Sequence, residues 1–222
     1  MQTSPSLLLV AKSTSTVGKR SAFALFPSPS LLGLFLFLGQ NESSEVAEPE
    51  GPSEMLRDKI FLVGFMGSGK STIGPIVAER LGWDFVDLDR EIEREQGLSI
   101  REIFQQSGEP EFRRIETTHL RGLKNRPACV VALGGGTFVQ KENRPIVSEM
   151  GVSVFLDCRL EVIEARCPVD GRRPLFEAPE LVKELYTTRQ PLYQKSDFSI
   201  DVSEIDPMQA ADLIFQKVTT RK

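Results

Sequence analysis

The stretch Gly64-Phe-Met-Gly-Ser-Gly-Lys-Ser71 indicates the fold more strongly than any other part of this sequence. It matches the pattern G-x-x-x-x-G-K-[ST], a glycine-rich loop whose backbone N–H groups point inward at phosphates. The context also matches, because the apolar run 59–63 before the loop predicts a buried strand and residues 71–81 after it have helical spacing. The N-terminus of that helix adds positive potential. The stretch therefore predicts binding of a nucleoside triphosphate.

Individual residues of this loop have distinct expected roles. Lys70 would reach the β- and γ-phosphates, and Ser71 is a candidate ligand of Mg²⁺. A chance glycine-rich turn is the alternative, but every specified position is filled between a strand and a helix. Pro75 is unexpected, because proline in the second turn of a helix removes a backbone hydrogen bond. The other residues expected to contact ATP are Gly67, Ser68, Gly69 and Thr72.

Patterns typical of strands and helices alternate from Met55 onward. A capping box at Ser99–Glu102 predicts the start of a short helix, residues 109–123 have helical periodicity, and Asp206-Pro207 begins the last helix. The alternation predicts an α/β fold, in which helices cover both faces of a parallel sheet. Apolar runs predict its strands at 59–63, 85–87, 130–133, 152–156 and 198–202.

The first 54 residues differ in character from the rest. Residues 1–41 contain no acidic residue, the apolar run 31–38 is too short to span a bilayer, and residues 42–54 have the composition of a disordered linker. A signal peptide is one interpretation, but a secreted enzyme would have no ATP. The segment is therefore interpreted as a dispensable extension, with Met55 as an alternative start, or as a plastid transit peptide. Residues 55–222 are expected to form one domain.

Composition and missing motifs exclude several classes of protein. The chain of 222 residues has 27 basic and 31 acidic residues, so its net charge of −4 disfavours nucleic acid and anionic membranes as partners. Three cysteines without C-x-x-C spacing indicate a reducing compartment and no zinc site. The single histidine, His119, is expected to be a half-buried helix residue. No N-K-x-D or D-x-x-G motif of a GTPase occurs, which favours a small-molecule kinase.

Two aspartates follow the second predicted strand. Asp87 and Asp89 would lie at its C-terminal end, where ligands bind in parallel sheets, and alternation along an extended segment would put both carboxylates on one side. Asp87 would support Mg²⁺ through water, and Asp89 would accept the proton of an acceptor hydroxyl. A pair of solvated loop aspartates is the alternative.

Arginines and glycines complete a candidate acceptor pocket. Arg113 and Arg114 point about 100° apart on a helix, so one can face the cleft while the other meets an acidic neighbour. Gly134–Gly136 at a strand end would let a ligand approach backbone N–H groups, although a plain tight turn fits as well. Arg189 ends a helix, and Arg173 lies in a Pro/Gly-rich stretch expected to be a lid. Guanidinium groups suit carboxylate and phosphate, so the acceptor is expected to be a small hydroxylated acid.

The ordered set of motifs resembles the shikimate kinases over nearly all of residues 55–222. The resemblance implies a five-stranded parallel sheet of the nucleoside-monophosphate-kinase type with a lid. It also implies ATP-dependent phosphorylation of the 3-hydroxyl of shikimate, in aromatic amino-acid biosynthesis. Each short motif except the phosphate loop is weak alone, but their order is specific: the loop, Asp87-Leu-Asp89, Phe112-Arg-Arg-Ile-Glu116, Gly134-Gly-Gly136, Arg173-Pro-Leu and Arg189-x-Pro-Leu-Tyr193.

The resemblance also implies roles, partners and location. Catalysis would rest on Asp89, Lys70 and Arg173, with Ser71 and Asp87 serving Mg²⁺. Arg166 would lie along the adenine, and Arg173 would contact ATP from the lid. The enzyme would be a monomer acting on shikimate and ATP, cytoplasmic as in bacteria or plastid-imported as in plants. The spacing from Arg173 to Arg189 is shorter than usual, and a gluconate-kinase-like enzyme or a silent homologue stays an alternative. Shikimate itself would be held by Asp89, Arg113, Gly134, Gly135, Gly136 and Arg189.

Overall fold

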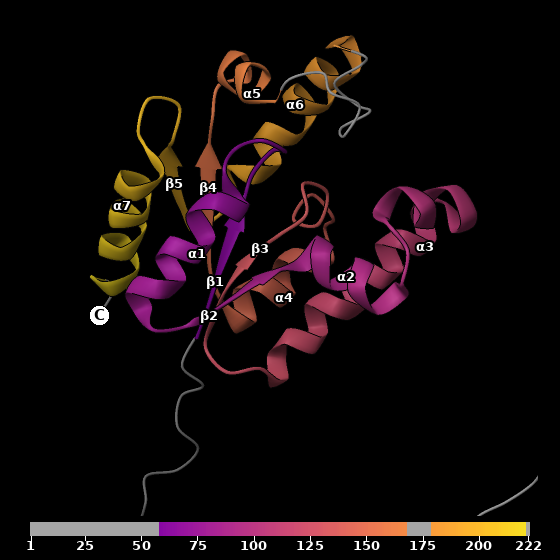
Figure 1. Ribbon diagram of the computed structural model, residues 1–222, viewed down its shortest axis with the longest axis horizontal. Coiled ribbons are helices and arrows are strands. Elements are labelled where there is room, and N and C mark those ends of the chain that lie inside the picture. Colours follow the sequence, from indigo (N-terminus) through magenta and orange to yellow (C-terminus); the bar gives the residue numbers. More distant parts are fainter. Residues whose placement is uncertain (1–57, 168–178, 221–222) are drawn as a thin grey trace, which may run out of the picture. The chain divides into compact units, whose positions relative to one another are not determined.

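Five parallel strands form the centre of the computed structural model, which describes residues 58–167 and 179–220. Their order across the sheet is β2-β3-β1-β4-β5, and every adjacent pair is parallel. All residues of β1 and β3 are buried, as expected for central strands covered on both faces. The predicted α/β class and five-stranded sheet are confirmed (Figure 1). The strands are β1 (Lys59–Val63), β2 (Asp84–Asp87), β3 (Cys129–Ala132), β4 (Gly151–Asp157) and β5 (Phe198–Asp201).

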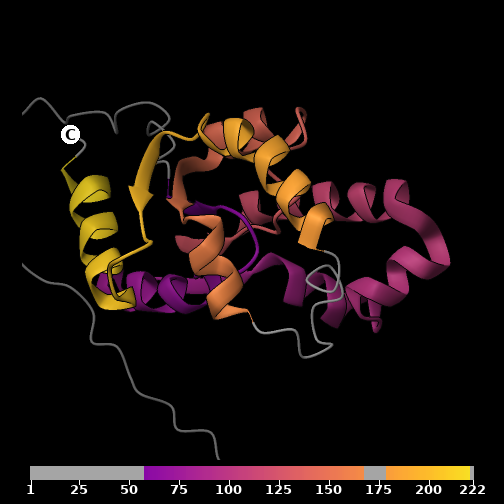
Figure 2. The ribbon, with the colours of Figure 1, turned by 90° about the horizontal axis from the view of Figure 1, so that it is seen from above.

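Helices cover both faces of the sheet. Figure 2 shows α1 and α7 packed together on one face, and α4 lies against β4 on the other. A short 3₁₀ turn, Leu123–Asn125, leads from α3 into β3. No helix among residues 58–167 and 179–220 is long and apolar enough to cross a membrane. The helices are α1 (Lys70–Leu81), α2 (Leu88–Gln96), α3 (Ile100–Gly122), α4 (Asn143–Met150), α5 (Leu160–Arg166), α6 (Pro179–Tyr193) and α7 (Pro207–Thr219).

Local signals set several helix ends where the sequence predicts them. Ser99 and Asp206 each form a full capping box, at the starts of α3 and α7. The two helices predicted around residues 99–123 are joined into α3 across a kink at Gly108, where φ is 79° and ψ is 170°. His119 is half-buried in α3, as expected, and its ring nitrogens lie 2.9 Å from Ile115 O and Glu95 Oε2.

The segment after β2 is a helix, so the prediction of an extended Asp87–Asp89 segment is wrong. Asp87 is the N-cap of α2, and its carboxylate accepts the backbone N–H of Arg90 at 3.4 Å. Asp89 lies in the first turn of α2. Leu88 and Ile92, both buried, are the only apolar residues of this charged helix, which is too few for a sequence pattern to predict a helix there. Helices α4 and α5, of eight and seven residues, are also absent from the sequence predictions.

Helix α1 continues through Pro75 to Leu81. The neighbouring Gly74 is buried and faces Phe85 of β2, and a Cβ at Gly74 would overlap the Phe85 ring. The close contact of α1 with β2 therefore accounts for the glycine. It gives no functional account of Pro75.

Candidate active site

The loop between β1 and α1 has the backbone of a phosphate cradle. Gly69 is the N-cap of α1 in the left-handed conformation, with φ of 100°. Gly64 has φ of 150°, and a Cβ there would lie 2.8 Å from Ser68 Oγ and 2.9 Å from Leu156 O. Both positions therefore require glycine, because a side chain would be strained and would push the loop off its neighbours.

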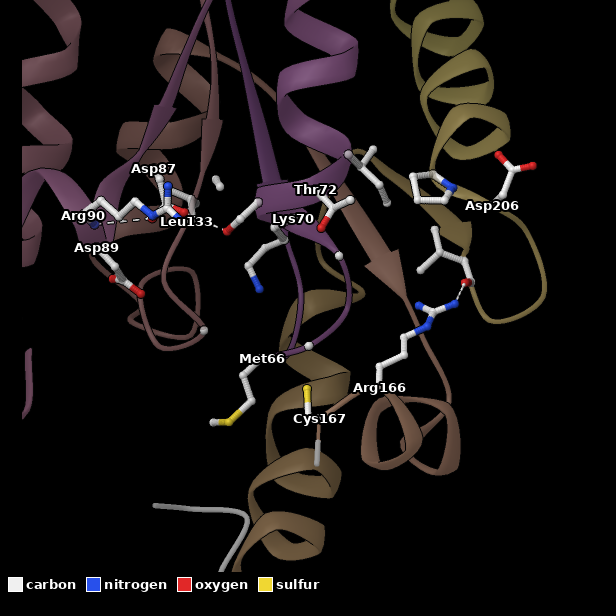
Figure 3. Close-up of a pocket in the computed structure, with 18 of the residues that line it drawn as sticks. Met66, Lys70, Thr72, Asp87, Asp89, Arg90, Leu133, Arg166, Cys167 and Asp206 are labelled. Atoms are coloured by element: carbon white, nitrogen blue, oxygen red, sulfur yellow. Dashed lines mark hydrogen bonds between the residues drawn. The ribbon is translucent and has the colours of Figure 1, made fainter. Parts of the chain in front are cut away.

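A cavity of about 800 Å³ opens beside this loop, at the C-terminal ends of the strands (Figure 3). Asp87, Asp89 and Arg90 lie at one end, while Arg166 and Asp206 lie at the other. Topology places ligand sites of parallel sheets at this edge. Of the residues predicted to bind ATP, Mg²⁺ or the acceptor, those lining the cavity are Gly67, Gly69, Lys70, Ser71, Thr72, Asp87, Asp89, Gly135 and Arg166.

Lys70 is oriented by short contacts within the phosphate loop. Lys70 Nζ donates to the carbonyl oxygens of Gly64 at 2.7 Å and Phe65 at 2.8 Å, so its charge is held inside the curve of the loop. Ser68, predicted to contact ATP, does not line the cavity; its side chain is buried and its backbone N–H donates to Phe65 O at 3.2 Å. Arg173, the predicted lid arginine, lies outside the described residues.

The Ser71 and Asp87 pair fits a magnesium ion that binds together with nucleotide. Ser71 Oγ donates to Asp87 Oδ2 at 2.7 Å, which places two oxygen ligands side by side at the cavity. Mg²⁺ keeps several waters and is usually bound by one or two protein oxygens plus substrate phosphates. Within the described part of the chain, no group of three or more His, Cys, Asp or Glu side chains could hold a metal by itself. The Ser71 and Asp87 pair therefore suits an ion that arrives with the nucleotide.

Asp89 has the electrostatic environment of a proton acceptor. Burial, followed by the nearby carboxylates of Glu116 and Asp87, raises the pKa of Asp89 from 3.8 to about 6, while Lys70 opposes the shift. A carboxylate with such a pKa is ionised near neutral pH and still basic enough to accept a proton from a hydroxyl.

Arg113 and the outer glycines form the wall beside Asp89. A Cβ at Gly134 would lie 2.5 Å from Asp89 Oδ1, and a Cβ at Gly136 would overlap the Arg113 guanidinium. The glycines therefore leave the space that these two side chains occupy. The sequence predicts that one of the adjacent arginines meets an acidic neighbour, and Arg114 does pair with Glu111 at 2.7 Å.

Arg113 is itself held by two carboxylates. Its Nη1 donates to Glu116 Oε2 at 2.8 Å, and its Nη2 donates to Glu109 Oε1 at 2.9 Å. Glu116 is fully buried and also accepts hydrogen bonds from Thr137 Oγ1 and from Gln140 Nε2, the latter at 2.6 Å. Sequence reasoning assigned Glu116 no role, although a carboxylate three positions after a candidate binding arginine is a signal for a positioning residue.

The middle glycine contacts the end of α6. Tyr193 is buried, and its hydroxyl donates to Gly135 O at 2.5 Å. Burial raises the pKa of Tyr193 to about 12, although Arg189 and Arg113 oppose the shift, so the hydroxyl keeps its proton for this bond. Arg189 Nη1 lies 3.5 Å from the position that a Cβ at Gly135 would take. Thus Asp89, Arg113, Arg189 and the three glycines converge, as predicted from widely separated motifs.

The far end of the cavity contains residues that sequence reasoning missed. Arg166, predicted to lie along adenine, donates from Nη2 to Val202 O at 3.1 Å and from Nη1 to Cys158 Sγ at 3.5 Å. These contacts hold its guanidinium beside the β5–α7 connection (Figure 3). Further lining residues without a predicted role are Cys167, Val202, Ile205, Asp206 and Pro207, and Arg90 at the opposite end.

Comparisons with known proteins agree with this geometry. A family model described as shikimate kinase matches residues 66–219. A shikimate kinase from Persephonella marina is 39% identical over 160 residues, which cover 72% of this chain and 98% of that protein. A shikimate kinase from Geobacter sulfurreducens is 43% identical over 147 residues, covering 65% and 81%. A solved structure of shikimate kinase from Acinetobacter baumannii in complex with shikimate superposes with a TM-score of 0.71 and 36% identity, covering 76% of this chain and 96% of that one.

Proposed function

The chain belongs to the shikimate kinase family, and on this premise we propose that it transfers the γ-phosphate of ATP to the 3-hydroxyl of shikimate. The observation that carries the proposal is the convergence of Asp89, Arg113, Arg189 and Gly134–Gly136, of which Asp89 and Gly135 line the cavity beside the phosphate loop. This arrangement presents a proton acceptor, two guanidinium groups and an open backbone to a hydroxylated acid. The product of this reaction would be shikimate 3-phosphate, an intermediate of aromatic amino-acid biosynthesis.

Asp89 would act on the attacking hydroxyl. As the shikimate oxygen forms its bond to the γ-phosphorus, the bond from phosphorus to the β-phosphate oxygen breaks and ADP leaves. The hydroxyl proton passes to the Asp89 carboxylate, whose pKa of about 6 suits this role near neutral pH. Lys70 and the loop N–H groups would face the phosphates. Mg²⁺, held through Ser71 and Asp87, would supply charge neutralisation on the phosphates.

Two arginines would position the acid. Arg113 and Arg189 offer planar donors that suit a carboxylate, and Glu116 would fix the direction of the Arg113 guanidinium. Tyr193 would hold the Gly135 carbonyl away from the acceptor. Arg166 would lie along the adenine, and Arg173 would contact the transferring phosphate.

We further propose that residues 55–222 form the catalytic domain and that residues 1–54 are an extension or targeting segment. The family match within residues 66–219 supports the first part. The enzyme would work as a monomer in a compartment with ATP and reduced thiols. The cytoplasm fits, with the plastid as the alternative if residues 1–54 are a transit peptide, and three free buried cysteines suit either.

ADP release by the full chain, with Mg·ATP and with or without shikimate, tests the proposed reaction. Strong shikimate-dependent turnover is expected, and quinate and gluconate serve as comparison acceptors. ATP binding with ADP release that does not depend on shikimate would contradict the proposal.

Arg113→Ala should raise KM for shikimate far more than KM for ATP, whereas equal effects on both KM values would make Arg113 a structural residue only. Comparing residues 55–222 with the full chain tests the proposed domain boundary.

A further inference from the structure

A second cavity, of about 370 Å³, lies between α4 and the α6–β5 connection. It shares no lining residue with the active-site cavity. Its floor contains Phe138 and Val147, both almost completely buried. Its basic residues are Lys141 just before α4, Arg144 in the first turn of α4, and Lys195 before β5. Apolar floor and basic rim together are typical of sites for small amphipathic anions.

The charge of this cavity is unbalanced. Its one acidic residue, Asp197, accepts hydrogen bonds at Oδ2 from Ser153 N at 2.9 Å and from Ser153 Oγ at 2.8 Å, so that oxygen is directed to β4. Against this single negative charge stand the three cations Lys141, Arg144 and Lys195. The cavity therefore carries an excess of two positive charges.

One guanidinium nitrogen of Arg144 lacks an acceptor. Its Nη1 is buried without a hydrogen-bond partner among the described residues. A buried guanidinium nitrogen without an acceptor is costly, and native structures usually satisfy such groups with protein, water or a ligand. By contrast, Arg113 and Arg114 each make two or more contacts with carboxylates. The excess charge and the cavity together indicate a missing anionic partner.

We propose that this cavity binds a small organic anion, one that carries a phosphate or carboxylate on an apolar group. The anionic head would accept from Arg144, Lys141 and Lys195, and the apolar group would lie on Phe138 and Val147. Charge-assisted contacts to arginine and lysine are the strongest class of hydrogen bond available there.

The site is joined to the acceptor pocket by one short segment. Phe138 and Lys141 line the second cavity, and they flank Gln140, which donates to Glu116 at 2.6 Å. Glu116 holds Arg113 beside the triple glycine. An anion that orders this segment should therefore change KM for shikimate more than KM for ATP, since only the acceptor pocket contains Arg113.

Calorimetric titration of the full chain with phenyl phosphate tests the site. Saturating ADP and shikimate are present throughout, so that only the γ-phosphate position of the active site stays open, and the substitutions below distinguish binding there from binding in the second cavity. Phenyl phosphate should bind, and inorganic phosphate and benzyl alcohol should each bind more weakly, because each offers only half of the required chemistry. Absence of phenyl phosphate binding, or equal binding of benzyl alcohol, would overturn the proposal.

Substitutions locate the binding. Arg144→Ala and Lys195→Ala should each weaken phenyl phosphate binding about tenfold, the effect of losing one charge-assisted contact. Ser148→Asp adds a negative charge to the cavity and should weaken binding at least as much. Lys183→Ala removes an exposed lysine of α6 outside the cavity and should change nothing. Lys195 is exposed, so its truncation spares the core, and equal affinities of Lys195→Ala and Lys183→Ala for phenyl phosphate would refute the site.

An unchanged KM for shikimate in saturating phenyl phosphate would refute the coupling of this cavity to the acceptor pocket.

Discussion

Replacing Asp89 by asparagine is expected to stabilise the folded protein while it abolishes turnover. Burial, Glu116 and Asp87 raise the pKa of Asp89 from 3.8 to about 6. Each pKa unit corresponds to about 1.4 kcal/mol, so the shift of about 2 units costs the folded state about 3 kcal/mol once the carboxylate is ionised. An amide of the same shape carries no charge and avoids this cost.

The effect depends on pH in a defined direction. Below pH 3.8 Asp89 is protonated in both the folded and the unfolded state, and the wild-type chain carries no penalty. The penalty grows as the pH rises from 3.8, because the unfolded chain ionises first, and it is complete above about 6. Asp89→Asn should therefore raise the free energy of unfolding by about 3 kcal/mol at pH 8 and by about half of that at pH 5.

Urea denaturation of the nucleotide-free protein at these two pH values measures the difference. Asp84→Asn is a matched control, because Asp84 is an exposed carboxylate at the start of β2, the strand that leads into α2, and a change within about 0.5 kcal/mol is expected. The same Asp89→Asn sample should bind ATP almost normally and release no ADP with shikimate. Lower stability than wild type at pH 8, or an equal difference at both pH values, would refute the electrostatic reasoning. Turnover at the wild-type kcat would refute the role of Asp89 as proton acceptor.

Three further outcomes are expected. Gly136→Ala places a methyl group on the Arg113 guanidinium and should raise KM for shikimate about tenfold in steady-state kinetics, while KM for ATP stays nearly constant. An equal rise in both KM values would contradict the placement of Gly136 and Arg113 in the shikimate pocket. Gly74→Ala drives a methyl group into the Phe85 ring and should lower stability by about 1–3 kcal/mol, so an unchanged urea midpoint would show that α1 shifts freely. Below pH about 6, protonation of Asp89 should reduce kcat/KM for shikimate about tenfold per pH unit, and a flat profile from pH 5 to 7 would exclude Asp89 as the base.

Much of the fold and part of the site can be predicted from the sequence, because those features depend on neighbours along the chain. The phosphate loop is a local backbone motif, and β1 is a continuous apolar run between turn residues. The capping boxes at Ser99 and Asp206 need only residues three positions apart. Predicted strand ends differ from the structure by at most one residue, and those small differences arise because pairing with neighbouring strands decides where a strand stops.

Other features depend on residues that meet only after folding. Asp87 and Asp89 were expected on an extended segment, but capping by Asp87 starts a helix there and turns Asp89 toward Glu116, which comes from α3. The sequence alone determined which residue types are available to bind phosphate and an acid. The tertiary structure decided that Glu116 is buried against Arg113, that the pKa of Asp89 is about 6, and that the β5–α7 connection completes the far end of the cavity. Burial and through-space charge set these properties, and neither is encoded in the spacing of residues along one segment.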